Sequence, residues 1–469
     1  MIILFLKGSA RDMNEYESYG NAEFGDERVS KRLPRILKQL SSKPEASISA
    51  SCLDPYQAKA AYRFVGNEDV TTDAITKIAH DVTIENITAA NPPVVLIPQD
   101  TSGISYNTLR ATSGLGSMGN NKDALGIQLH SAVAFGEDGE VFGLLAQKIW
   151  VRPPENFGRS DSTRAKMPIE EKESYKWLET MENAEVSLPE GTMAVHICDR
   201  EGDIFELFCK AEEIKANYLC RRTFNRSIEE KDGLKKLDDY VNALPEDGRV
   251  TIRVPRDSHT NRKERDAEMA IKFGRCRIKK SVTLAGNKEL PESIEVYVIS
   301  AVETTPPAGQ EKIIWRLITN VPTVNFEDAL TRIQWYTQRW KIETFHRTLK
   351  SGCKVEELQC STADKLMKLI TIYSIISLQI MLLTYVARTR PDETCEIILT
   401  EDEWKILYRV AKKTKELPEK PPTVYEAVNM IAKLGGFLGR KSDGYPGVTV
   451  VWRGLSDLYT ILDAAQFLV

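Results

Sequence analysis

Three carboxylates stand out in the sequence because each lies where folding would fix its position. Asp100 ends the apolar run "PVVLIPQD", and Asp199 ends the apolar run "GTMAVHICD". Glu343 is the only acid in the cationic stretch "YTQRWKIETFHRTLK". A carboxylate at the end of a buried strand is half desolvated, so it needs a cation or several hydrogen-bond donors to remain charged.

Convergence of these three carboxylates would make a site for a hard divalent metal ion. Their mutual repulsion would require a cation, and a set of oxygen ligands favours Mg²⁺ or Mn²⁺. Two ions held in this way can activate a water or a 3′-hydroxyl and stabilise the leaving oxygen of an in-line phosphoryl displacement. Buried acids could also serve a glycosidase, but a glycosidase would not explain the cations around Glu343.

The cations around Glu343 share its side of a predicted helix. At about 100° per residue, Tyr336, Arg339, Glu343 and Lys350 fall within an arc of about 60°. One interpretation is a solvated face on which Arg339 pairs with Glu343 at i,i+4. The other is an acid that binds metal while Arg339 and Lys350 neutralise the phosphates of a substrate. The stretch by itself does not choose between them.

The composition bounds the class of protein. The chain has 469 residues, of which 42% are hydrophobic and 28% charged, enough for two or three globular domains. The net charge of −4 excludes a chain that is basic throughout, although local basic faces remain open. None of the eight cysteines forms a CxxC pair, so we expect neither a zinc knuckle nor a disulfide framework, but a reducing, cytoplasmic location.

One segment raises the question of a membrane. Residues 369–387, "LITIYSIISLQIMLLTYVA", carry no charge over about one membrane span. Polar residues recur through the segment and no second span exists, which favours a buried core helix. The apolar run in the opening residues "MIILFLKGSARD" is too short for a signal peptide. We therefore expect no membrane partner.

A basic amphipathic pattern lies near the start of the chain. Residues 24–43 predict a helix, and Pro34 lies inside the pattern, where a proline can split a helix. The polar side is either the solvated face of a small helical domain or a surface that lies against a DNA backbone or groove. The candidate DNA-contacting cations on this side are Arg28, Lys31, Arg32 and Arg35.

The middle of the chain has the patterns of β-strands. "IQLHSAVAFGEDGEVFGLLAQKIWVR" predicts a β-hairpin around the turn "GEDGE". Residues 249–300 alternate apolar and polar side chains without a helical period, which predicts antiparallel strands in an inserted sheet. "KIIWRLITN" is the last predicted strand before the helix of Glu343, and residues 388–469 have a helical pattern.

Several motifs, in the same order along the chain, resemble the insertion-sequence-four (IS-four) family of bacterial transposases. The run Tyr336-x2-Arg339-x3-Glu343-x6-Lys350 resembles the YREK signature of that family. "FGDERVSKRL" and "AAYRFVGN" resemble its N-terminal DNA-binding region, and "KLGGF" lies where the family has its dimerisation region. "QDTSGISY" and "CDREGDI" resemble the segments that carry its first and second catalytic aspartates.

The resemblance implies an α/β fold with a ribonuclease-H-like catalytic core and an inserted antiparallel β-subdomain, flanked by helical N- and C-terminal domains. The expected layout is a DNA-binding domain at 1–75, a catalytic domain at 76–387 and a dimerisation domain at 388–469. The β insertion is expected at about 205–312, between the second aspartate and the glutamate.

The resemblance also implies roles for single residues. Asp100, Asp199 and Glu343 match the catalytic triad, which binds two Mg²⁺ ions, with Mn²⁺ as a substitute. Tyr336, Arg339 and Lys350 match the residues that hold phosphates near the transposon end.

Two further positions match family residues that act on the DNA end. Trp315 lies where the family places an aromatic side chain that stacks on a flipped base, and stacking offsets the few kcal/mol that flipping costs. Without the family, Trp315 would be read as a core tryptophan on a strand. Arg221 aligns with an arginine near the DNA hairpin.

The implied function is a DNA transposase. Such an enzyme binds double-stranded transposon ends, cleaves them through a hairpin intermediate and joins them to target DNA, as a dimer on the DNA and at the nucleoid. One alternative is a catalytically inactive regulator that binds DNA and dimerises, and another is a metal-dependent nuclease without joining activity. The presence of all three acids and of the YREK residues favours the active enzyme.

Overall fold

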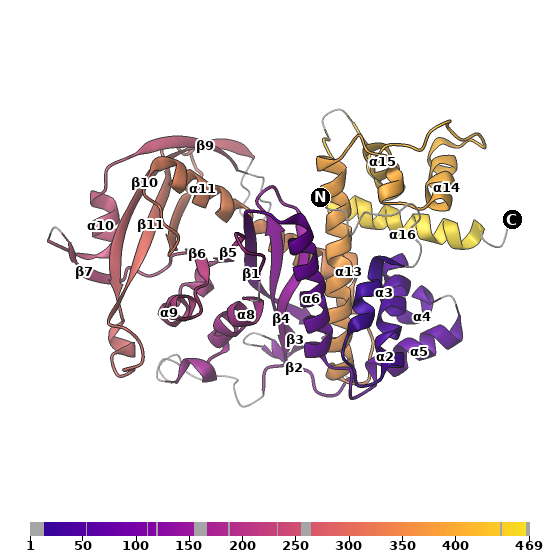
Figure 1. The fold of residues 1–469 in the computed structure, drawn as a ribbon, viewed down its shortest axis with the longest axis horizontal. Helices are drawn as coiled ribbons and strands as arrows, with labels where there is room; N and C mark the ends of the chain where they lie inside the picture. The colour runs from indigo at the N-terminus through magenta and orange to yellow at the C-terminus, as the bar shows by residue number, and fades with distance from the viewer. Residues whose placement is uncertain are drawn as a thin grey trace.

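A computed structural model gives the structure of the chain (Figure 1). It describes residues 14–52, 54–109, 111–118, 121–153, 167–185, 188–231, 233–254, 264–440 and 443–465.

Five strands form the core of a mixed sheet. They are β1 (Val94–Ser105), β3 (Asn121–Gly136), β4 (Val141–Trp150), β5 (Met193–Cys198) and β6 (Asn217–Arg221). Their order is β4-β3-β1-β5-β6; β1, β3 and β4 pair antiparallel, whereas β5 pairs in parallel with β1 and β6. A parallel neighbour requires a crossover, which the helix α9 (Phe205–Ile214) provides between β5 and β6. The arrangement is ribonuclease-H-like and confirms the predicted fold class.

Further strands extend the same sheet beyond β6. They are β7 (Ser227–Lys231), β8 (Leu234–Lys236), β9 (Gly248–Val254), β10 (Arg265–Lys279), β11 (Ser293–Glu303) and β12 (Ile314–Thr319). The order continues as β6-β12-β11-β10-β7-β8, with β9 also paired to β10, and β2 (Gly116–Met118) lies beside β3 at the other edge. The antiparallel sheet predicted from alternation is therefore hydrogen-bonded to the core. The insertion expected at about 205–312 overlaps α9 and β6, which belong to the parallel crossover.

Helices cover the two faces of the sheet. α8 (Lys176–Ala184) and α9 pack on one face, where Trp177, Phe208 and Tyr218 share a core. α11 (Phe326–Thr337) packs on the other face, over a core that includes Leu96 and Ile197. The sheet thus separates an α9 side from an α11 side, and the side that a strand residue faces follows from the two-residue alternation.

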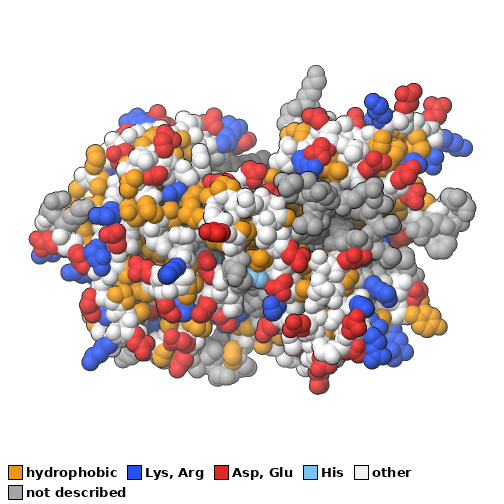
Figure 2. All heavy atoms as spheres, in the orientation of Figure 1, with side chains coloured by type: hydrophobic (Ala, Val, Ile, Leu, Met, Phe, Trp, Pro, Cys, Tyr) orange, Lys and Arg blue, Asp and Glu red, His pale blue; other side chains and the backbone are white. Residues whose placement is uncertain are grey.

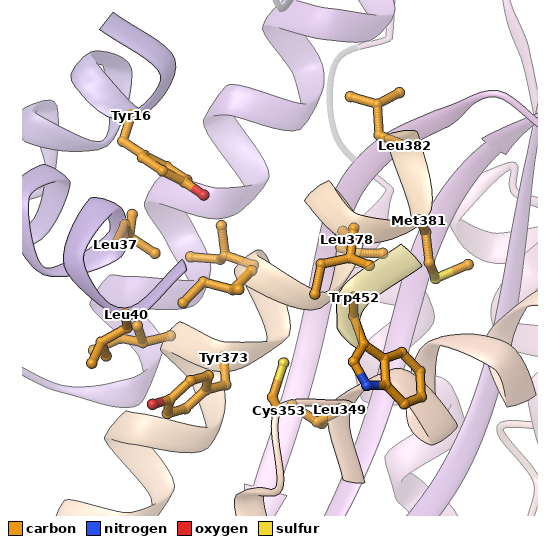
Figure 3. Close-up of a cluster of buried hydrophobic side chains, with 14 of the residues drawn as sticks. Tyr16, Leu37, Leu40, Leu349, Cys353, Tyr373, Leu378, Met381, Leu382 and Trp452 are labelled. Atoms are coloured by element: carbon orange, nitrogen blue, oxygen red, sulfur yellow. The ribbon is translucent and has the colours of Figure 1, made fainter. Parts of the chain in front are cut away.

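A long apolar helix, α13 (Ala363–Thr389), joins the two ends of the chain. Its most apolar window is 89% buried, as predicted for a core helix, although the helix is long and apolar enough to cross a membrane. Figure 3 shows Leu37 and Leu40 of α3 on one side of α13 and Trp452 of α16 on another. The N-terminal and C-terminal helices therefore share one hydrophobic core around α13.

The remaining helices are mostly short. The N-terminal set comprises the 3-10 helix η1 (Asn14–Asn21), α2 (Glu27–Ser30), α3 (Arg32–Ser42), α4 (Ile48–Ser51), α5 (Pro55–Val65) and α6 (Thr72–Ala90). The others are α10 (Leu237–Ala243), α12 (Trp340–Arg347), α14 (Glu401–Lys412), α15 (Val424–Leu434) and α16 (Val448–Ala465). The helix predicted at 24–43 is divided at Lys31. Pro34 is the third residue of α3, where its missing N–H has no intrahelical partner to lose.

Candidate active site

The ends of β1 and β5 bring the two aspartates side by side. Pro98 pairs with Ile197, so the same parallel register, extended by two residues, places Asp100 level with Asp199. Neighbouring strands lie about 4.8 Å apart. Leu96 and Ile197 face α11, and alternation turns Asp100 and Asp199 toward the same side.

Burial raises the pKa of both aspartates, and neighbouring carboxylates add to the rise. Burial raises the pKa of Asp100 to about 6, and the charges of Asp199 and Glu343 add to this rise. The backbone N–H of Thr101, 2.8 Å from the carboxylate, and the charge of Arg339 oppose it. Burial also raises the pKa of Asp199, although its carboxylate accepts a hydrogen bond of 2.7 Å from the N–H of Glu201. All three acids therefore belong to one electrostatic site.

The helix that carries Glu343 is not continuous, so the predicted single helix over 336–350 is wrong. α11 ends at Thr337 and α12 begins at Trp340, and the junction is made by i→i+3 hydrogen bonds such as that from the N–H of Arg339 to the carbonyl of Tyr336. A π-helical turn, Thr348–Gly352, follows α12. Side-chain spacing reports the angle around a helix but not the changes in its hydrogen-bond ladder.

Arg339 lies between Glu343 and the aspartates. It donates a hydrogen bond to the Glu343 carboxylate, so the i,i+4 pair is present. Yet the Arg339 side chain is only 20% exposed, against 56% for Glu343, and the charges of Asp100 and Asp199 also interact with it. The Arg339–Glu343 pair is therefore not an isolated ion pair on a solvated surface, because Arg339 is buried and its charge also acts on the two aspartates.

Tyr336 connects Arg339 to the strands beyond Asp199. Its ring lies 5.8 Å from that of Trp315 at an interplanar angle of 66°, and its phenol group interacts electrostatically with the Arg221 side chain. Cys198 pairs with Cys220, so Arg221 lies level with Asp199 on the next strand. Trp315 is half-buried on β12, where the Arg221 side chain also donates to the carbonyl of Ile314 over 3.1 Å. The structure thus brings Tyr336, Trp315 and Arg221 together beside the acids.

Lys350 reaches the same strand as the first aspartate. Its Nζ donates to the carbonyl of Gly103 over 2.9 Å and lies 3.6 Å from the Glu356 carboxylate. Gly103 follows Asp100 by three residues on β1. Lys350 therefore anchors the π-helical turn that follows α12 against β1.

A buried chain of polar side chains, which was not predicted from the sequence, supports β1 from the opposite side. The His130 ring hydrogen-bonds with the Thr101 hydroxyl (2.9 Å) and with the side-chain oxygen Oε1 of Gln99 (3.2 Å). The Gln99 amide meets His196 at 2.8 Å, and His196 meets Glu185 at 2.9 Å. Histidines within the apolar runs "IQLHSAVAF" and "AVHIC" were the available signal. These hydrogen bonds satisfy the side chains of Gln99 and Thr101, the residues directly before and after Asp100 in the sequence.

The turn of the β3–β4 hairpin holds the helices that carry the YREK residues. The Glu137 carboxylate accepts from Trp335 Nε1 of α11 over 2.6 Å, and Asp138 accepts from the Tyr385 hydroxyl of α13 over 2.6 Å. Lys341 of α12 lies over the Phe135 ring, with its Nζ 5.4 Å from the centroid. The hairpin was predicted from the sequence, but these contacts were not.

The candidate DNA-contacting cations of the N-terminal region lie on one exposed surface. Arg28 pairs with Asp26, and Lys31 pairs with Glu27, in exposed ion pairs. Arg32 and Arg35 are exposed on α3, and within the described residues neither has a carboxylate at ion-pair distance. Figure 2 shows Lys and Arg side chains gathered over the N-terminal helices, at the lower right of the view. Arg32 and Arg35 are thus more available to phosphates than Arg28 and Lys31.

The described part of the chain has no group of three or more His, Cys, Asp or Glu side chains arranged to hold a metal ion. The reason is visible at Glu343, whose carboxylate binds Arg339. The strand-end aspartates nevertheless have the character of ligands for a hard cation, because each offers carboxylate oxygens whose negative charge is disfavoured by burial and by a neighbouring acid.

Three family models match the chain. They are described as transposase DNA-binding (residues 16–70), transposase DDE domain (235–378) and transposase Tn5 dimerisation domain (375–468). The chain also matches a cryo-EM structure of a piggyBac transposase synaptic complex with hairpin DNA, at 10% identity and a TM-score of 0.35, over 100% of this chain and 81% of that chain.

These three domains define a DNA transposase of the DDE class. Among such enzymes the chain is Tn5-like, since its C-terminal match is to the Tn5 dimerisation domain. The match to the DDE domain spans Glu343 but begins after Asp100 and Asp199.

Proposed function

We propose that Asp100, Asp199 and Glu343 are the catalytic triad of this transposase. The observation that carries the proposal is the register of β1 and β5, which sets the two aspartates level on the α11 side, where burial raises the pKa of Asp100 and the charge of Glu343 adds to this rise. A triad in this place would cleave transposon ends through a hairpin intermediate and transfer the strand to target DNA. We also propose that the chain belongs to the IS-four family, with Tyr336, Arg339, Glu343 and Lys350 as its YREK residues.

A DDE domain implies the use of divalent metal. We propose Mg²⁺, two ions per site, with Mn²⁺ as a substitute. Asp100 and Asp199 would hold the metal, together with Glu343 once its carboxylate is released from Arg339. When bound, the metal would activate the attacking oxygen and stabilise the leaving oxygen of the phosphoryl transfer.

The protein's own side chains would then position the DNA strand. Arg339 and Lys350 would hold phosphates next to the acids, and an arginine can do so with two parallel hydrogen bonds. Trp315 would stack on a flipped base, with its ring braced by Tyr336, and Arg221 would stabilise the hairpin. These contacts involve the DNA backbone or a base of any kind, so they do not discriminate between sequences. Recognition of the DNA sequence would depend on the N-terminal helices.

We further propose the layout that such an enzyme requires. Residues 1–75 would bind transposon ends through Arg32 and Arg35. Arg28 and Lys31 would also contact the DNA once they leave their ion pairs with acidic neighbours for the phosphates. Residues 76–387 would catalyse, with the insertion running from the end of β6 to about 312, and residues 388–469 would pair two subunits on DNA. All eight cysteines are free thiols, which fits a reducing cytoplasm.

The test replaces each triad acid with its amide, as Asp100→Asn, Asp199→Asn and Glu343→Gln. End DNA would come from inverted repeats flanking the reading frame. Single-turnover cleavage with Mg²⁺ should fall to background in each variant, whereas end affinity should stay within about twofold, because phosphate contacts supply most of the binding. Asp402→Asn, at an exposed acid of α14, is the matched control.

Two outcomes would speak against the proposal. A triad variant that cleaves at the wild-type rate would remove that residue from the site. A wild-type protein that binds ends and dimerises but never cleaves would instead support the inactive regulator.

A further inference from the structure

A cleft of about 550 Å³ opens on the α9 side of the sheet. It is lined by the start of α9, the loop between β6 and β7, the end of β10 and the 3-10 turn at Val282–Leu284. Asp100 and Asp199 face the α11 side, so the cleft is not part of the acidic site. It is nevertheless linked to that site, because Asp203 in its wall follows Asp199 by one turn, Arg200–Gly202.

Cations dominate the charge of this cleft. Lys172, Lys236 and Lys279 line it, and among the residues that the structure describes none of the three has a carboxylate at ion-pair distance. Two further cations of the lining, Arg226 and Lys280, are paired with Asp203 and Glu292. Three cations are thus left to meet an anionic partner.

The acids of the lining do not cancel this charge. The Asp203 side chain is fully buried, and its carboxylate accepts from the N–H of Thr223 (2.6 Å) and of Phe224 (2.9 Å) as well as from Arg226. Glu206, in the first turn of α9, is buried as well. Because Asp203 is fully engaged within the protein, it holds the loop in place and leaves the lysines as the accessible charges.

The loop that Asp203 holds presents an aromatic ring to solvent. Phe224 is 58% exposed although the Arg226 guanidinium lies 5.4 Å from its ring centroid, and Val282 on another part of the lining is 92% exposed. Exposed apolar side chains next to unpaired cations are typical of surfaces that bind nucleic acid, where rings contact bases and cations contact phosphates. A small anion would need the cations but not the ring.

We propose that this cleft binds target DNA. Lysines bind phosphates as point charges and do not read bases, so the contact would be independent of sequence, as capture of a target requires. The alternative duplex is the DNA that flanks the transposon end. That flank is joined covalently to an end that is already bound and gains a high effective concentration, whereas a target arrives as a separate molecule and needs binding contacts of its own. The inference rests on the proposed strand-transfer function.

The experiment compares two triple variants of the full-length protein that lose the same charge. The cleft variant combines Lys172→Ala, Lys236→Ala and Lys279→Ala. The control combines Lys235→Ala, Lys288→Ala and Lys420→Ala, which are exposed lysines outside the cleft. Fluorescence anisotropy measures the affinity of each protein, bound to pre-cleaved ends, for a labelled random-sequence duplex over a range of salt. Single-turnover cleavage of end DNA is measured in parallel.

We expect the cleft variant to lose at least about tenfold in target affinity and to show a shallower salt dependence, by roughly 0.9 for each lost phosphate contact. Its cleavage of ends should match that of the control. Phe224→Ala should weaken target binding without changing the salt slope. Equal target affinity in the two triple variants would overturn the inference, and loss of end cleavage with intact target affinity would assign the cleft to the flank. If the wild type binds both duplexes but never cleaves, the proposed function fails, while the affinity difference still decides the role of the cleft.

Discussion

At the scale of single residues, we expect a change at Arg339 to affect cleavage strongly. It is the buried cation between Glu343 and the two aspartates. Arg339→Ala should lower the single-turnover cleavage rate of pre-bound ends by at least about tenfold, which corresponds to about 1.4 kcal/mol in the barrier. Arg339→Lys should restore part of the rate, because it keeps the charge but not the two parallel hydrogen bonds. An exposed i,i+4 pair is worth only about 0.3–0.5 kcal/mol, so a rate within about twofold of wild type would reduce Arg339 to such a pair.

Asp100 should make the stability of the protein depend on pH. Burial raises its pKa to about 6 from an ordinary value of 3.8, so the folded state favours the protonated carboxyl. The resulting stabilisation is present below pH 4 and is lost as the pH rises through 6, and a shift of this size corresponds to about 3 kcal/mol. In a metal chelator, Asp100→Asn should therefore raise the thermal midpoint at pH 7.5 and change it little at pH 4. A thermal midpoint that rises equally at both pH values would show that burial of the ionised Asp100 carboxylate does not destabilise the fold.

At the scale of elements, the β3–β4 turn fixes where α11 gives way to α12. Glu137 accepts the indole N–H of Trp335, the residue before Tyr336. Glu137→Ala would leave that N–H without its partner at a cost of about 1–3 kcal/mol. We expect a slower cleavage rate with unchanged end affinity, and recovery in Glu137→Gln, which keeps an acceptor. The matched control is Asp138→Asn, which alters the contact to Tyr385 of α13 and should change stability without changing the rate. Equal rates in Glu137→Ala and wild type would show that the turn does not position the YREK residues.

The elements also show what the sequence could and could not predict. The strand-end aspartates, the hairpin and the inserted antiparallel strands followed from short patterns, because a strand's alternation is set by local burial. The junction at Gln338 and Arg339 and the π-helical turn did not follow, since a helical period is insensitive to one altered hydrogen bond. The chain from Glu185 to Thr101 joins three strands and α8, so only the tertiary structure could place His130 against Gln99.

At the scale of the whole molecule, the end-binding and dimerisation regions share one core around α13. Lys43, after α3, pairs with Asp463 of α16 at 2.6 Å, and Leu40 and Trp452 belong to the same hydrophobic cluster. An end bound by the N-terminal helices is therefore rigidly tied to the C-terminal helices. Pairing of two C-terminal regions would bring two ends to two active sites in a fixed geometry, which a single active site cannot do for two distant ends.

The region matched to the dimerisation domain exposes several large apolar side chains. Leu438 is 66% exposed, and Tyr425 is 41% exposed with its ring 5.4 Å from that of Tyr445. Combining Tyr425→Glu with Leu438→Glu should weaken the complex of two proteins with two ends at least about tenfold, or about 1.4 kcal/mol, because two charges would replace apolar contacts at the interface. Binding of one protein to one end should be unchanged.

Light scattering of the full-length protein with end DNA measures the stoichiometry. Val324→Glu, at a residue 68% exposed outside this region, is the control. A double variant that still pairs ends like the control would place the interface elsewhere, and strand transfer by a strictly monomeric complex would show that pairing is not required.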